Sequence, residues 1–232
     1  MFGAVDRKPL LNLKSLKEQV YEYLREQMRH GQLLPGSAID MEETSKKLGV
    51  SKTPLRDALL QLETEDFVTI RPRRMIVVNA LTEKDIRNYY EIIGALESMA
   101  LLKAFERMTP ADFDRMQALN DGMKTAIESG DFDAYYEKNL AFHDVFVGLC
   151  DNASLVKMVN NLKKRLYDFP RPRGFVKEWE EASIEEHQAL VDLLRAGRSR
   201  DAADHIRDVH WSFEVQERFV RKYYPSITKP PE

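Results

Sequence analysis

The chain has 232 residues, of which 43% are hydrophobic and 31% charged, and its formal net charge is −3. This composition is ordinary for a folded globular protein and excludes collagen-like, disordered and disulfide-stapled chains. The single cysteine, Cys150, has no partner for an internal disulfide and offers no cysteine-rich metal motif. The sequence shows neither the apolar block of a signal peptide nor the ~20 apolar residues of a membrane span, so we expect a cytoplasmic protein without a membrane partner.

The length favours two domains, and the charge differs between the parts of the chain before and after Val78. Residues 1–78 carry 13 Lys and Arg against 11 Asp and Glu, net +2, and residues 79–232 carry 22 against 27, net −5. Residues 46–74 alone carry seven basic and four acidic side chains, net +3. Nucleic-acid binding depends on where the basic residues lie rather than on the total charge, so this segment indicates a DNA-binding surface.

The first part of the chain predicts a helix-turn-helix followed by a β wing. Helical spacing of apolar residues predicts helices from about Leu13 to His30, from Met41 to Leu48, and from the N-cap candidate Ser51 onward. The short connection between the last two helices is typical of a helix-turn-helix. Two β-branched runs, 67–70 and 75–78, predict a two-stranded ribbon with a basic tip.

The second part follows the helical period throughout. After a linker at 79–81 we expect six helices, which start near Thr82, Pro110, Phe132, Ser154, Val176 and Ser199. The segment Pro170–Gly174 separates the fourth from the fifth, and the sixth is expected to run to Tyr223. The predicted fold is mainly α, with a winged helix-turn-helix that has a small two-stranded β wing (1–78) and an antiparallel α-helical bundle (79–232).

The helix after Ser51 is expected to lie in the major groove of double-stranded DNA. Its first residues would contact phosphates and bases, and the guanidinium of Arg56 suits the O6 and N7 atoms of guanine. Arginines of the wing would reach the adjacent minor groove or the backbone. The predicted DNA-binding residues are Ser51, Lys52, Thr53, Arg56, Arg71, Arg73 and Arg74.

The run from Leu48 to Leu59, LGVSKTPLRDAL, resembles the winged-helix signature of GntR-type bacterial transcription regulators. The acidic helical part, with its pairs Phe142-His143 and Glu186-His187 and the late His210, resembles the FCD-type effector domain of the FadR subgroup. The resemblance implies a dimeric repressor or activator whose helical domain binds a small metabolite, often a carboxylate, frequently beside a divalent metal held by Asp or Asn and three His. The sequence departs from the family pattern at two positions. Lys52 stands where the family mostly has arginine, and Met75 stands where the wing usually has a glycine.

The implied metal site has a chemical basis in the helical part. Asn139 and His143 are four residues apart, so they project from the same face of one helix. With His187 and His210 they make one amide oxygen and three imidazoles, a set that suits Zn, Ni, Mn or Fe. His205 lies five residues before His210, on a different face of the predicted helix, and is left out. Asn in place of Asp lowers the negative charge of the site, so a metal-independent pocket remains an alternative.

The effector is less defined by the sequence. The resemblance implies an organic acid whose carboxylate is bound by an arginine near the position of Ile93 or Gly94. This chain has no arginine there, which argues for a different or less anionic ligand. Glu97 and Arg165 are weak candidates for effector contacts, and a buried ion pair or a surface position explains them equally well. Tyr89, Tyr90 and Trp211 are expected to pack in the core.

These features predict a ligand-responsive transcription regulator, expected to be a repressor and a homodimer and not an enzyme. The alternative is a metal-dependent hydrolase that uses His143, His187 and His210, but it lacks a general base if Glu186 points elsewhere, as its place beside His187 suggests. A helical protein-binding adaptor would leave the basic segment from Ser51 to Arg56 unexplained.

Overall fold

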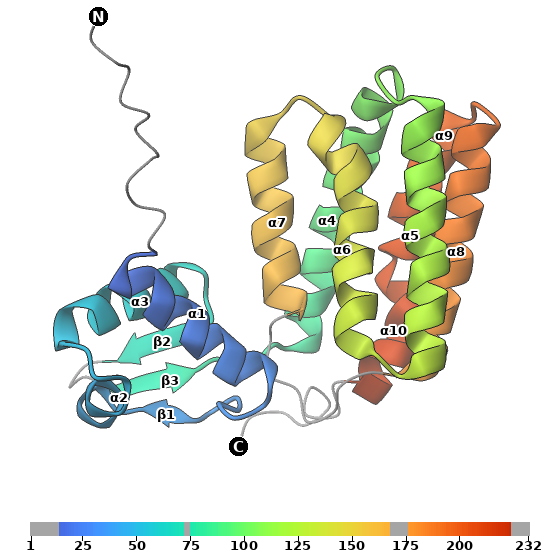
Figure 1. Ribbon diagram of the computed structural model, residues 1–232. Coiled ribbons are helices and arrows are strands. Elements are labelled where there is room, and N and C mark those ends of the chain that lie inside the picture. The colour runs from blue at the N-terminus through green and yellow to red at the C-terminus, as the bar shows by residue number, and fades with distance from the viewer. Residues whose placement is uncertain (1–13, 72–74, 168–175, 224–232) are drawn as a thin grey trace, which may run out of the picture. The chain divides into compact units, whose positions relative to one another are not determined.

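A computed structural model describes residues 14–71, 75–167 and 176–223 (Figure 1). The chain divides into two compact units, Met1–Ala80 and Leu81–Glu232. The division predicted after Val78 lies two residues before this boundary. Two predicted features, the break at Pro170–Gly174 and the wing arginines Arg73 and Arg74, lie outside the described residues.

In its described residues, the first unit contains three helices whose ends follow from local sequence. They are α1 (Leu16–Arg29), α2 (Met41–Leu48) and α3 (Lys52–Thr64). The Asp40 carboxylate accepts hydrogen bonds from the backbone amides of Glu42 and Glu43, which caps the start of α2. Gly49 ends α2 in the left-handed conformation, with φ of 65°, which a residue without a Cβ adopts at little cost. The predicted helix-turn-helix is therefore present.

The strands of this unit form a three-stranded antiparallel sheet in the order β1-β3-β2, from β1 (Ala38–Ile39), β2 (Val68–Arg71) and β3 (Met75–Val78). Strands β2 and β3 confirm the predicted wing. Strand β1, which the sequence did not predict, adds a third strand to this ribbon. With two residues, β1 is too short to show an alternating pattern in the sequence.

Apolar side chains of α1, α3 and the sheet share one core. The larger side chains exposed by 2% or less include Leu24, Met28, Leu55, Leu59, Leu62, Phe67 and Ile76. Burial of each such side chain contributes about 1.5–3 kcal/mol. Because Leu55, Leu59 and Leu62 hold one face of α3 against this core, the opposite face and the start of the helix are presented to solvent.

The second unit is a helical bundle built around α4 (Figure 1). Its elements are α4 (Glu83–Phe105), α5 (Pro110–Ser129), α6 (Phe132–Leu149), α7 (Ala153–Tyr167), α8 (Lys177–Arg195), α9 (Ser199–His205), the π-helical turn η2 (Ile206–His210) and α10 (Phe213–Tyr223). Helix α4 packs against α6, α7, α9 and η2, and α5 packs against α6 and α8. None of the helices in the described ranges is both long enough and apolar enough to span a bilayer.

The predicted sixth helix, 199–223, is wrong as a single element. The structure divides it into α9, the wider turn η2 and α10, with Trp211 and Ser212 between the last two. The wider turn changes the faces on which the following residues lie, and both His210 and Trp211 are buried. Apolar residues on both sides of the break fit the ordinary helical period, so the sequence pattern does not reveal it.

Candidate functional site

The start of α3 presents a polar surface with an unused hydroxyl. Ser51, Lys52, Thr53 and Arg56 are all exposed there. Ser51 occupies the N-cap position as predicted, but its side chain makes no capping hydrogen bond. Its hydroxyl and the backbone amides of the first turn therefore remain available to an anion such as a phosphate.

Nearby contacts leave this surface accessible. The Lys52 Nζ lies 3.2 Å from Glu42 Oε2, an exposed ion pair that contributes at most about 1 kcal/mol and opens easily. On the wing, exposed Arg71 ends β2 opposite Met75. Met75 starts β3 in ordinary strand conformation and is 47% exposed, so this position requires no glycine.

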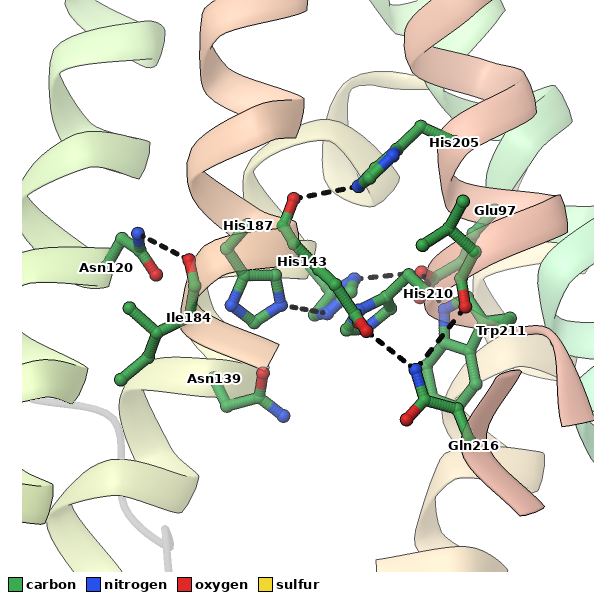
Figure 2. Close-up of polar contacts among 12 residues, drawn as sticks. Glu97, Asn120, Asn139, His143, Ile184, His187, His205, His210, Trp211 and Gln216 are labelled. Carbon is green, nitrogen blue, oxygen red and sulfur yellow. Dashed lines mark hydrogen bonds and ion pairs between the residues drawn. The ribbon is translucent and has the colours of Figure 1, made fainter. Parts of the chain in front are cut away.

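Three predicted metal ligands converge in the helical unit (Figure 2). His143 comes from α6, His187 from α8 and His210 from η2, and they are 0%, 1% and 9% exposed. One nitrogen from each ring lies within 4.8 Å of the others. The Nε2 atoms of His143 and His187 face each other at 3.3 Å, an arrangement that suits a shared cation.

Asn139, the fourth predicted ligand, lies one turn before His143 on α6 and is 5% exposed. Its Nδ2 donates to the Tyr167 hydroxyl at 3.3 Å. Its Oδ1 is buried and has no hydrogen-bond partner among the described residues, and in Figure 2 this oxygen lies on the side of His187. A buried acceptor without a partner costs free energy unless a cation or a donor satisfies it, so the four residues fit a divalent metal.

Carboxylates fix the orientation of two of the imidazoles. His143 Nδ1 donates to Glu97 Oε2 at 2.9 Å, and His210 Nδ1 donates to Glu186 Oε2 at 2.8 Å. Each bond leaves Nε2 as the ligand atom, which is the usual function of such outer partners around a metal. The interpretation that Glu186 points elsewhere is therefore wrong. His205 donates from Nε2 to the backbone carbonyl of Glu186 at 2.9 Å and does not join the group.

Glu97 is the centre of a buried charged network. It is 0% exposed, forms an ion pair with Lys163 of α7, and accepts from Trp211 Nε1 at 2.8 Å. Burial alone would raise the pKa of the Glu97 carboxyl, but His143 and Lys163 hold that pKa below its ordinary range. Burial lowers the pKa of His143 and His187, so both are neutral near pH 7. Neutral imidazoles are the form that binds metals.

The two weak effector candidates lie away from open space. Glu97 contacts His143 and Lys163, and Arg165, 9% exposed, lies over the ring of Tyr89 at 5.3 Å. Neither is among the residues that line the pocket, so their assignment as effector contacts gains no support. A Cβ atom at position 94 would lie 3.0 Å from the Trp211 Cβ. The close approach of Trp211 therefore favours glycine at this position over a residue with a long side chain such as arginine.

A pocket opens beside the histidine cluster, with about 720 Å³ of empty space, part of it open to solvent. Asn139 and His210 lie on its wall. The other lining residues are Ile86, Tyr90, Phe132, Tyr135, Tyr136, Leu166, Tyr167, Trp179, Glu180, Ser183, Glu186, Trp211 and Gln216. Tyr90 and Trp211, which were expected only to pack in the core, also form part of this lining.

Sequence reasoning missed several residues of this site. Lys163 continues the buried face of α7 that Leu155, Val159 and Leu166 define, and a lysine on such a face is a detectable signal of a buried partner. Glu180, Glu186 and Gln216 carry no comparable signal, because they lie on amphipathic helices where polar residues are expected.

A winged helix with an exposed recognition helix, joined to a helical unit with a pocket and a histidine cluster, is an architecture that suits a DNA-binding transcription regulator. The comparisons with known proteins agree. Residues 16–78 match bacterial regulatory proteins of the gntR family, and residues 88–210 match the FCD domain. The chain belongs to the GntR family of transcriptional regulators and carries an FCD effector domain, as the sequence motif predicted.

Individual relatives support the same assignment. The HTH-type transcriptional regulator McbR of Escherichia coli is 29% identical over 93% of this chain and 96% of McbR. The Nta operon transcriptional regulator of Aminobacter aminovorans is 31% identical over 72% and 77%, and the gluconate operon transcriptional repressor of Bacillus licheniformis is 24% identical over 82% and 79%. The solved structure of E. coli McbR/YncC aligns with a TM-score of 0.68 and 25% identity, over 92% of this chain and 99% of that one. The hydrolase alternative receives no support.

Proposed function

We propose that this regulator is a cytoplasmic homodimer that represses transcription and releases its operator when an effector fills the pocket of the helical unit. The observation that carries the proposal is the pocket itself, because residues of α4 line it and α4 is the first helix after the winged-helix unit. An effector that contacts Tyr90 would bias the helix that continues directly from the linker. The similarity to the gluconate operon transcriptional repressor supports repression rather than activation.

DNA recognition is assigned to the start of α3. Arg56 would contact a base edge, and Ser51, Lys52 and Thr53 would contact phosphates, with Arg71 on the adjacent backbone. The test is fluorescence anisotropy of the full chain on an operator selected from random DNA. We expect Arg56→Ala to weaken binding by about 1–3 kcal/mol and to relax the sequence preference.

An exposed lysine of the helical unit provides the matched control for this test. Lys124 is exposed on α5, and Lys124→Ala removes one positive charge without touching the winged helix. Its operator affinity is expected to equal that of the unchanged chain. Equal loss in Lys124→Ala and Arg56→Ala would contradict a specific interface, and an absence of sequence-selective binding at low salt would contradict the regulator function.

We also propose that Asn139, His143, His187 and His210 hold one divalent ion, of Zn, Ni, Mn or Fe. Such an ion would add a positive charge beside the part of the pocket wall that Asn139 and His210 form. The test is elemental analysis of protein purified without chelator or a His-tag, with about one ion per chain expected. His143→Ala should lose the ion and exposed His30→Ala should keep it, whereas retention by His143→Ala would overturn the assignment.

A second copy of the chain is proposed to cover an apolar face of the helical unit. Ile92 and Met99 on α4 and Met158 on α7 are 42%, 49% and 52% exposed, and these two helices pack against each other. Exposed large apolar side chains on adjacent helices favour association. A dimer would place two α3 helices on the half-sites of a palindromic operator.

A further inference from the structure

The pocket beside the histidine cluster has a lining of aromatic rings and carboxylates. The aromatic members are Tyr90, Phe132, Tyr135, Tyr136, Tyr167, Trp179 and Trp211. Glu180 and Glu186 supply carboxylates, and the described lining residues include neither lysine nor arginine. The faces of aromatic rings and carboxylate oxygens both attract cations. The electrostatic character of the lining therefore favours a positively charged group.

Three hydrogen-bond donors of the lining, on His210, Trp211 and Gln216, are engaged with acceptors within the protein. Gln216 Nε2 donates to Glu186 Oε1 at 2.8 Å, and His210 Nδ1 donates to the other oxygen of the same carboxylate. Trp211 Nε1 donates to Glu97. A ligand carboxylate, which needs donors, finds these groups committed to partners within the protein.

The pocket offers an unused acceptor instead. Gln216 is 2% exposed, and its Oε1 has no hydrogen-bond partner in the described part of the chain. Its Nε2 also reaches the carbonyl of Val209, at 3.4 Å, so contacts to two acceptors fix which end of the amide is the oxygen. In Figure 2 the Gln216 oxygen points away from both acceptors. A ligand N–H group would satisfy it.

The tyrosines next to Glu180 remain neutral. Burial raises the pKa of the Tyr135 phenol well above its ordinary value, and the charge of Glu180 raises it further. Burial likewise raises the pKa of Tyr167, whose ring stands edge-on to Tyr136 with the ring centroids 5.1 Å apart. These rings therefore present neutral faces and phenol oxygens beside a carboxylate.

We propose that the effector enters this pocket with an organic cation, an ammonium or guanidinium group, held by the aromatic rings, the Glu180 carboxylate and Gln216 Oε1. This inference rests on the proposed effector function of the pocket and names the chemical class of its ligand. It departs from the carboxylate effectors that the resemblance implies, because the described wall is rich in acceptors and His210, Trp211 and Gln216 donate to partners within the protein.

Two matched pairs of probes test the charge preference. Choline is compared with its uncharged isostere 3,3-dimethylbutan-1-ol, and phenethylammonium with 3-phenylpropionate. Both tryptophans of the chain, Trp179 and Trp211, line the pocket, so quenching of intrinsic fluorescence reports occupancy. The titrations use the full chain after treatment with EDTA. We expect each cation to bind about tenfold more tightly than its partner, the effect of one desolvated cation–π contact.

A pair of variants on the same helix tests the assigned residue. Glu180→Gln keeps the shape of the side chain and removes its charge, and we expect choline affinity to fall about tenfold. Glu181→Gln is the matched control, because Glu181 is exposed next to it on α8 and does not line this pocket. Circular dichroism of both variants establishes that they fold alike.

The outcomes separate this inference from the proposed function. Tighter or equal binding of 3-phenylpropionate, or choline affinity no higher than that of the neutral isostere, overturns the cation assignment, and so does an absence of binding by all probes. Unchanged choline affinity in Glu180→Gln also overturns it. Operator binding is measured separately, so a regulator that binds DNA but ignores cations loses only this inference.

Discussion

Replacement of Lys163 by methionine is the sharpest test of the buried network behind the histidines. The variant Lys163→Met keeps an unbranched side chain, one heavy atom shorter, and removes its ammonium group. Lys163 is 3% exposed and Glu97 is 0% exposed, so the change leaves a buried carboxylate without its cation. Removal of one partner of a buried ion pair costs about 3–5 kcal/mol.

The remaining contacts of Glu97 set the expected value within this range. His143 Nδ1 and Trp211 Nε1 still donate to Glu97 Oε2, at 2.9 and 2.8 Å, so we expect the lower end, about 3 kcal/mol. At about 2–4 °C per kcal/mol for a unit of this size, the melting temperature of the helical unit should fall by about 6–12 °C. The assay is thermal and urea unfolding followed by circular dichroism, in EDTA.

Two further variants make this test decisive. Lys222→Met removes an exposed lysine that pairs with Glu178 at 2.7 Å, and the cost should stay below about 1 kcal/mol. The double variant Glu97→Gln with Lys163→Met removes both charges and should recover part of the loss. Equal effects of Lys163→Met and Lys222→Met would refute the buried pair.

Three other predictions concern the ligands, the pH response and the dimer. Asn139→Asp adds a carboxylate to the histidine set and should tighten Zn²⁺ binding by about tenfold in competition with a chelating dye; weaker binding would contradict Asn139 as a ligand. In EDTA, the free energy of unfolding should fall as the pH drops below about 6.5, because burial lowers the pKa of His143 and His187 in the folded state and the unfolded chain then takes up more protons. Exposed His30→Gln should keep this slope, His187→Gln should reduce it, and a flat profile would count against the burial of these rings. Met99→Glu should convert the dimer to a monomer in sedimentation, and an unchanged mass would exclude that face.

Most of the winged-helix unit is predictable from sequence because its signals are local. The helix α2 begins and ends where an acidic cap and Gly49 place it, and Ser51 stands at the N-cap of α3 as expected. The strand β1 is the exception, since two residues carry no periodicity and the strand exists only through its pairing with β3. The solvent-facing residues of α3 follow from the same helical period that defines its core.

The helical unit is less predictable where its function resides. The spacing of Asn139 and His143 showed a shared helix face, but the approach of His187 and His210 depends on how α6, α8 and η2 pack. The π-helical turn that orients His210 has no signature in apolar spacing. The pairing of Glu97 with Lys163 joins two helices distant in sequence, and only the tertiary structure shows it.

Glu186 links the two proposed binding events of the helical unit. One oxygen of its carboxylate accepts from His210, a predicted metal ligand, and the other accepts from Gln216, whose Oε1 is the proposed contact of the cation. A divalent ion held beside His210 would add positive charge near the pocket, so we expect it to weaken choline binding. Thermodynamic linkage requires choline to weaken the affinity for the ion by the same factor. The measurement is choline affinity with and without ZnCl₂, and Zn²⁺ affinity with and without choline. An unchanged affinity for choline in ZnCl₂ would contradict the electrostatic coupling through this carboxylate, and so would a stronger affinity.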